Sequence, residues 1–269
     1  MTIAIGTLFN NGAVVCADTK VVASDGATTM DNKVFASLSP KGRMFLIADA
    51  AEDANAAKML GGEISSAICD AKHPYNLGSV IKPVMTAWHS SYHHFQPPNL
   101  QFLIASVVVG DKRGQVFVCE PPSTVAYGWP IAIGRGARVV EPRLLILSSY
   151  PKESLDAKSV LLRLAYLMYL AKKDEGSACG GDTNTFVIST MGSIAWIEQK
   201  EMKEAENLAE EMDSFLVGTI DKVIGHSQEY FGQKLSDTLA AVSEKYKKFE
   251  FPSLKMLETI VMPKKEGTK

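Results

Sequence analysis

Short hydrophobic runs separated by turn-forming residues dominate the first fifty positions of the chain. The sequence Asn10-Asn11-Gly12 contains an Asn-Gly step, which is typical of the tight turn of a β-hairpin. A second turn, Pro40-Lys41-Gly42, also separates two β-rich runs. The pattern therefore predicts two early antiparallel hairpins, with strands over residues 2–9 and 13–19, and over residues 33–38 and 43–48.

After about residue 50, the spacing between hydrophobic residues changes from two to about four positions. Between Ala50 and Ala71, hydrophobic residues recur at Ala56, Leu60, Ile64 and Ile68, which indicates a helix. A second helix is predicted over residues 77–95, where Pro83 would kink it or lie in its first turn. The same patterns predict strands over 101–109 and 115–119, helices around Leu144 and over 155–172, and a last hairpin over 185–190 and 193–197.

Hairpins interleaved with helix pairs predict an α+β fold in which two antiparallel sheets pack together and helices cover their outer faces. We assign this domain to residues 2–200. Residues 201–269 differ, because they are acidic and then amphipathic, and they are predicted to form a long helical extension over about 201–248 and a tail. Gly218, Gly225 and Gly232 recur every seven residues, which fits either close helix packing or a chance weakening of the helix.

Composition and charge limit which binding partners and which compartment are expected. The net charge of −2 over 269 residues gives no electrostatic case for nucleic acid or an anionic membrane. No apolar run approaches the roughly 20 residues that span a bilayer, and no secretory signal pattern is present, so we expect a cytoplasmic protein. Cys16, Cys69, Cys119 and Cys179 form no C-x-x-C pair and read as reduced thiols. No cofactor is expected.

The N-terminus carries the candidate chemistry. The small Thr2 favours removal of Met1, which would place a hydroxyl and a free α-amine on one residue. An α-amine titrates at about 7.7–8.0, so it can accept the proton of its own hydroxyl and make a nucleophile with a built-in base. Two antiparallel strands would bring Asp18 and Lys33 beside Thr2.

With this spacing of Thr2, Asp18 and Lys33, residues 2–197 resemble the proteasome β-type family of N-terminal nucleophile hydrolases. The resemblance implies a four-layer αββα sandwich in which the threonine attacks a peptide carbonyl, the aspartate and lysine hold and tune it, and a glycine amide binds the oxyanion. It also implies peptide or unfolded-protein substrates and a ring or other closed homo-oligomer. A regulatory ATPase is left undetermined.

Three supporting positions depart from the family pattern. Asp49 stands where the family has its oxyanion glycine, and Arg135 stands where it usually has a serine. The segment 176–181, which contains Cys179, lacks the aspartate of the family's Asp-x-x-Ser-Gly-Gly pattern. Either Arg135 and Asp49 pair across the site as compensation, or the fold persists while turnover is impaired.

Val21 and Ile47 predict an apolar pocket for the residue before the cleaved bond. The leading hypothesis is a threonine peptidase that forms an acyl-enzyme on Thr2. The alternatives are a small-amide hydrolase with the same nucleophile and an inactive proteasome-like scaffold. His89 and His93 have a spacing that can bind a metal, but with no third ligand they are interpreted as a solvated helix face, so no metal site is expected.

Overall fold

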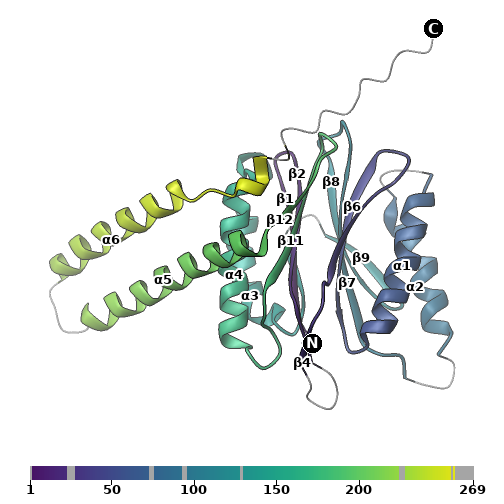
Figure 1. Cartoon of the computed structure of the whole chain (residues 1–269), viewed down its shortest axis with the longest axis horizontal. Coiled ribbons are helices and arrows are strands. Elements are labelled where there is room, and N and C mark those ends of the chain that lie inside the picture. Colours follow the sequence, from purple (N-terminus) through teal and green to yellow (C-terminus); the bar gives the residue numbers. More distant parts are fainter. Residues whose placement is uncertain are drawn as a thin grey trace, which may run out of the picture.

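The computed structural model describes residues 2–22, 28–72, 76–92, 96–127, 130–223, 228–255 and 257. Two five-stranded antiparallel sheets lie face to face, and a layer of helices covers the outer side of each (Figure 1). The α+β class and the four-layer αββα sandwich are therefore confirmed.

The first sheet has the order β10-β1-β2-β11-β12, with bounds Ile131–Gly134, Ile3–Phe9, Gly12–Asp18, Thr183–Ser189 and Ile194–Ile197. The second has the order β5-β6-β7-β8-β9, with bounds Val34–Leu38, Arg43–Ala51, Leu100–Val108, Gly114–Glu120 and Ser123–Tyr127. A small ribbon, β3 (Lys20–Val22) and β4 (Thr28–Met30), lies between β2 and β5 in the chain. The four predicted hairpins are confirmed, whereas β3, β4, β9 and β10 were not predicted.

The helices follow in pairs. They are α1 (Ala54–Asp70) and α2 (Leu77–Ser90), then α3 (Ala137–Ser148) and α4 (Ala157–Asp174), then α5 (Gln199–Val223) and α6 (Gln228–Lys248), with single 3-10 turns at Lys152–Ser154 and Pro252–Leu254. The first helix begins later than predicted because β6 continues to Ala51. Asp53 then caps α1 by accepting hydrogen bonds from the amides of Asn55 and Ala56. Pro83 lies inside α2 rather than in its first turn.

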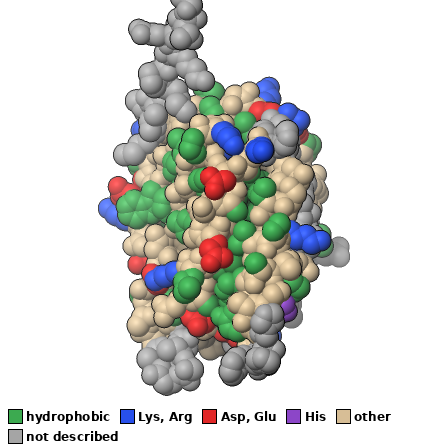
Figure 2. All heavy atoms as spheres, turned by 90° about the vertical axis from the view of Figure 1, so that its right-hand side faces the viewer, with side chains coloured by type: hydrophobic (Ala, Val, Ile, Leu, Met, Phe, Trp, Pro, Cys, Tyr) green, Lys and Arg blue, Asp and Glu red, His purple; other side chains and the backbone are tan. Residues whose placement is uncertain are grey.

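Three hydrophobic cores separate the four layers. The side chains of strand β1 alternate between two of these cores. Ile3 and Ile5 face the core under α3 and α4, whereas Ala4 and Leu8 face the core between the sheets. The third core, between the second sheet and α1 and α2, contains Ile47 among its residues. Figure 2 looks onto the outer face of that helix layer, where hydrophobic side chains form patches among separated acidic and basic groups.

The C-terminal extension is a pair of helices, so the expected single helix over about 201–248 is wrong. Helix α5 ends at Val223, and α6 begins at Gln228 and returns beside it as an arm that projects from the sandwich (Figure 1). Lys245 on α6 and Glu211 on α5 form an ion pair of 2.5 Å. The intervening residues include Gly225, a weak helix former. Gly225 lies outside the described residues, as do the surroundings of Gly218 and Gly232.

The base of the arm shares a core with the sandwich. Met202, Ala205 and Phe251 are buried in the core under α3 and α4. The Glu201 carboxylate accepts hydrogen bonds from the amide and hydroxyl of Ser253, both at 3.0 Å. The division at residue 200 stays a prediction, and the first turns of α5 nevertheless pack as part of the sandwich. The predicted tail, residues 263–269, lies outside the described residues.

Candidate active site

Pairing of β1 with β2 brings Thr2 to the end of β2. The Asp18 Oδ1 atom accepts hydrogen bonds from the Thr2 hydroxyl and, at 3.2 Å, from the Ile3 amide. Thr2 and Asp18 are both buried, with exposed fractions of 1% and 0%. The first hairpin therefore places the predicted nucleophile directly against the predicted carboxylate.

Lys33 completes the cluster from the start of the second sheet. Its Nζ lies 2.5 Å from Thr2 Oγ1 and 2.9 Å from Asp18 Oδ1. It also donates to the Lys20 carbonyl oxygen. Because an ammonium group has three donors, these three acceptors fix it in place. The result is a buried positive charge held at the Thr2 hydroxyl.

The second carboxylate oxygen of Asp18 is held from the segment that leads into β11, the other neighbour of β2 in the sheet. Asp18 Oδ2 accepts a hydrogen bond of 2.9 Å from the Gly180 amide. Burial raises the pKa of Asp18, while Lys33 and the amides of Gly180 and Ile3 oppose that rise. The segment that lacks the family's aspartate thus still contributes a backbone donor to the site.

The end of β10 closes over the backbone of Thr2. Gly134 has φ +85°, and a Cβ there would lie 2.2 Å from the Thr2 carbonyl oxygen, so only glycine fits. A Cβ on Gly136 would lie 2.9 Å from Cys179 Sγ. Cys179 is buried, and burial raises the pKa of its thiol to about 12. This thiol therefore packs against the site rather than acting as a second nucleophile.

Asp49 does not supply a free amide, which corrects the expectation that it replaces the oxyanion glycine. Its N–H donates to the Lys33 carbonyl oxygen at 3.2 Å. The next amide on the same edge is that of Ala51, since backbone amides alternate along a strand. Glu52 N donates to the carbonyl oxygen of Asn99, which immediately precedes β7. The Ala51 N–H therefore points to the opposite edge of β6, past the start of β5.

The pocket beside Thr2 is not the apolar one that was expected. Val21 lines it, but Ile47 is fully buried in the core under α1 and α2. Asp49 lies two residues beyond Ile47, and its side chain lines the pocket instead. Burial raises the pKa of Asp49 to about 6, which Lys33 opposes. Ile47 and Asp49 lie on the same face of β6, but Ile47 lies deeper under α1, whereas Asp49, nearer the end of the strand, reaches the pocket.

Arg135 pairs with an acid other than Asp49. Its Nε lies 3.7 Å from Glu175 Oε2, and Arg138 binds the other oxygen of the same carboxylate. Glu175 is buried at the C-terminal end of α4. Arg135 therefore pairs with Glu175 on the α4 side of Thr2. This pair takes the place of the expected compensating pair between Arg135 and Asp49.

The described residues contain no group of three or more side chains arranged to bind a metal ion. His89 lies on α2, whereas His93 is outside the described part of the chain. The four cysteines are free, as expected of reduced thiols. Among the described helices, none is long and apolar enough to cross a bilayer.

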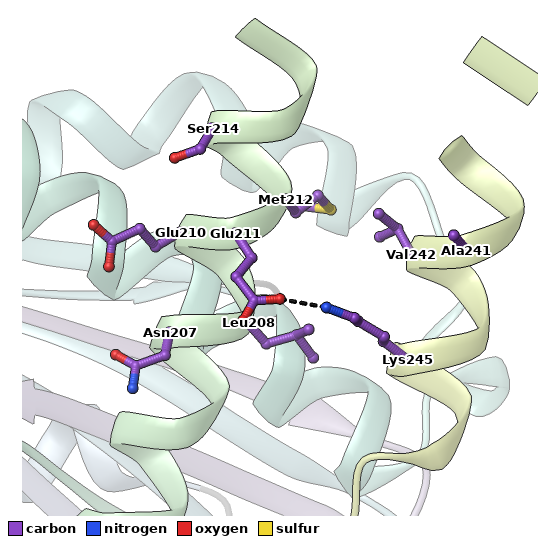
Figure 3. A pocket seen from close by; sticks show the side chains of 9 residues that line it. All are labelled: Asn207, Leu208, Glu210, Glu211, Met212, Ser214, Ala241, Val242 and Lys245. Carbon is purple, nitrogen blue, oxygen red and sulfur yellow. Dashed lines mark hydrogen bonds and ion pairs between the residues drawn. The ribbon is translucent and has the colours of Figure 1, made fainter. Parts of the chain in front are cut away.

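Cavities flank Thr2 on two sides. One, of about 30 Å³, is lined by Val21, Asp49 and α1 residues. The other, of about 270 Å³, is lined by Ala51, Gln101 and Arg135. Thr2 borders both cavities. A cavity of about 750 Å³ lies away from Thr2, between α5 and α6, where the Glu211–Lys245 ion pair bridges the helices (Figure 3).

No family model and no curated protein matches the sequence. Solved structures do match. Anbu from Yersinia bercovieri, described as an ancestral β-subunit, has a TM-score of 0.68 at 10% identity and covers 84% of this chain and 99% of its own. A mutant Anbu from Hyphomicrobium sp. strain MC1 has a TM-score of 0.65 at 14% identity, with 81% and 97% covered. The chain has the fold of the Anbu proteins.

A third match is the helical assembly of the Anbu complex from Pseudomonas aeruginosa, with a TM-score of 0.63, 10% identity, and 85% and 99% covered. At such identities the likeness to Anbu shows the fold alone. It confirms the N-terminal nucleophile hydrolase architecture expected from the resemblance. Together, β1, β2 and the start of β5 give this proteasome-like fold a Thr–Asp–Lys cluster at its N-terminal edge.

Proposed function

We propose that this protein is a threonine-type N-terminal nucleophile peptidase that acts through Thr2 after Met1 is removed. The observation that carries the proposal is the buried contact of Lys33 Nζ with both Thr2 Oγ1 and Asp18 Oδ1. A cation at a threonine hydroxyl lowers the cost of forming an alkoxide. A surface threonine with no catalytic role would not need a buried ion pair around its hydroxyl.

In the proposed reaction, Thr2 Oγ1 attacks the carbonyl carbon of a peptide bond, and its proton passes to the free α-amine of Thr2. The C–N bond then breaks, and the protonated α-amine returns the proton to the leaving amine. An ester between Thr2 and the acyl fragment remains. Water adds to this ester with the α-amine again as base, which releases the acid and restores the hydroxyl.

We assign the oxyanion to the amide of Ala51. Its N–H points past the start of β5 toward the space beside Thr2, and Ala51 borders both cavities at the hydroxyl. A donor fixed in a strand needs little reorganisation during the reaction, which is the property that makes such a group effective. Alanine suffices there because the backbone, rather than the side chain, supplies the hydrogen bond.

A self-compartmentalised homo-oligomer is part of the proposal. The Anbu match from Pseudomonas aeruginosa is described as a helical assembly, and the fold is shared with it. The arm formed by α5 and α6 projects from the sandwich and offers surface to a neighbouring copy (Figure 1). Peptides or unfolded proteins are the substrates proposed for an active site enclosed in such an assembly.

An inactive scaffold is the competing function, and the narrowness of the cavity beside Asp49 favours it. That cavity has about 30 Å³, close to the space of one water molecule.

Measuring peptide turnover distinguishes the peptidase from the inactive scaffold. Thr2→Ala should abolish hydrolysis of fluorogenic peptides and leave the fold intact, because it removes the nucleophile. Thr2→Ser should retain part of the activity through the same hydroxyl.

Thr7→Ala is the matched control. Thr7 is equally buried in β1, but its hydroxyl bonds to the Leu8 carbonyl and is remote from Asp18. Turnover should survive in this variant. Undiminished turnover by Thr2→Ala would overturn the assignment, and hydrolysis of simple amides in preference to peptides would favour a small-amide hydrolase.

A further inference from the structure

The small cavity beside Thr2 has a polar wall. It is formed where the end of β6, the start of α1 and the β3–β4 ribbon meet, and its lining includes Asp49, Asp31 and Lys58. Thr2 and Lys33 form its inner side. A substrate chain bound with its carbonyl at Thr2 Oγ1 would have one of its neighbouring side chains directed into this space.

Asp49 brings a partly buried carboxylate to this cavity. Its strand position turns the side chain to the α1 side, in line with Ile47. No side chain of the described residues hydrogen-bonds to the Asp49 carboxylate or forms an ion pair with it within 4.0 Å. A partly buried carboxylate that lacks a cationic partner is costly, and a ligand that supplies one is favoured for that reason.

The charged groups that face Asp49 are committed elsewhere. Lys33 is bonded to Thr2, Asp18 and the Lys20 carbonyl. Lys20 lines the cavity, but its Nζ donates to the Gly176 carbonyl at 2.6 Å. Glu52, which also lines the cavity, is an acid and accepts a hydrogen bond of 3.3 Å from the Asn99 amide.

Lys58 already places an ammonium group at the mouth of the cavity. Its Nζ lies 2.7 Å from Asp31 Oδ2, and its side chain is 62% exposed. An exposed ion pair of this kind contributes little to stability and is readily exchanged. The Lys58 ammonium group therefore occupies the position that a cation entering from solvent would take. Displacing the Lys58 side chain would widen the cavity.

We propose that this cavity binds a lysine or arginine side chain of a peptide, at the residue whose carbonyl is attacked, with Asp49 as the residue that selects it. The inference rests on the proposed peptidase function and adds the substrate class. The entering cation replaces Lys58 beside Asp31 and reaches Asp49 deeper in the cavity. An apolar side chain would leave Asp49 without a partner, and a site built around a buried polar group rejects ligands that leave it unpaired.

The test uses the full chain and three fluorogenic peptides that differ only in arginine, leucine or glutamate before the cleaved bond. Wild type should have the highest kcat/KM for arginine and the lowest for glutamate. Asp49→Asn should lower the arginine-to-leucine ratio of kcat/KM at least tenfold. Lys58→Gln should raise kcat/KM for arginine, because the competing internal cation is gone. Glu63→Gln, an equal charge change on the exposed side of α1, should keep the wild-type ratio.

A binding measurement keeps this inference separate from the proposed function. The Thr2→Ala chain, which cannot turn over, is titrated with N-acetyl-arginine amide and N-acetyl-leucine amide by calorimetry. Tighter binding of the arginine compound, lost in Thr2→Ala/Asp49→Asn, supports the cationic site even if no peptide is cleaved. Equal binding of both compounds, or an arginine preference that survives Asp49→Asn, overturns the inference whether or not Thr2 proves to be the nucleophile.

Discussion

At the scale of single residues, Asp49 links stability to the site. Its pKa is raised by burial from 3.8 to about 6, so the folded protein binds a proton more tightly than the unfolded chain does. Stability from this group is therefore present at pH 4 and is lost as the pH rises to about 6. Above that pH the folded state carries the cost of a partly buried carboxylate.

Asp49→Asn should remove that cost. Relative to wild type, we expect the variant to gain about 1–3 kcal/mol of unfolding free energy at pH 8 and almost nothing at pH 4. Urea denaturation at both pH values measures the difference. A gain of the same size at pH 4 and pH 8 would show that the titration of Asp49 is not its source.

Sequence reasoning found the three central residues but not their surroundings. Thr2, Asp18 and Lys33 lie at the ends of strands that the hydrophobic pattern defines, and antiparallel pairing brings them together. The sequence pattern predicts the oxyanion amide at Asp49, whereas we propose that of Ala51, because a sequence pattern does not say which amides of β6 are already bonded to β5. That information comes from the register and from the Asp49–Lys33 backbone hydrogen bond.

At the scale of elements, α5 is anchored by a buried ion pair. Lys172 on α4 binds Glu206 on α5 at 2.8 Å, and both bond to the Thr183 hydroxyl of β11. Their side chains have exposed fractions of 14% and 4%. The network ties the base of the arm to the strand that pairs with the Asp18 end of β2.

Glu206→Ala should therefore destabilise the protein by about 3–5 kcal/mol, because Lys172 is left buried without its partner. The double variant Lys172→Met/Glu206→Leu should recover most of the loss. Asp213→Ala breaks the more exposed Lys173–Asp213 pair between the same helices, and it should cost about 1 kcal/mol or less. Equal losses for Glu206→Ala and Asp213→Ala in thermal or denaturant unfolding would contradict a buried anchor.

The element boundaries show where local patterns fail. Residues Ala50 and Ala51 have high helix propensity, yet they extend β6 because pairing with β7 outweighs that preference. The break between α5 and α6 was missed for a related reason. Both helices carry the same amphipathic period, and the sequence pattern treats them as continuous although α6 folds back along α5.

At the scale of the whole molecule, the arm is the segment proposed to contact another copy. Leu239 on α6 is 52% exposed, and Leu145 on α3 is 71% exposed. Leu239→Glu should shift the chain toward its 29.2 kDa monomer in multi-angle light scattering, since a charge at an apolar contact opposes association. Leu145→Glu, the matched change on the sandwich, should keep the wild-type mass. The reverse result would place the interface on the sandwich instead.

The arm cannot be removed as a block to answer the same question. Met202, Ala205 and Phe251 belong to the core under α3 and α4, so truncation after residue 200 would expose that core as well as delete the arm. Loss of assembly in such a truncation would therefore report instability as readily as a missing interface. Single changes on exposed arm positions avoid this ambiguity.

The central claim, that Thr2 is the nucleophile, is tested most directly by mass spectrometry of the N-terminal peptide after incubation with an electrophilic peptide probe. We predict that Met1 is absent and that one probe molecule is attached at Thr2 in wild type and in Thr7→Ala, with no adduct in Thr2→Ala. Retention of Met1 throughout would contradict the claim, because the free α-amine of Thr2 would be missing. An adduct at another residue that persists in Thr2→Ala would contradict it as well, because the ester would not be on Thr2.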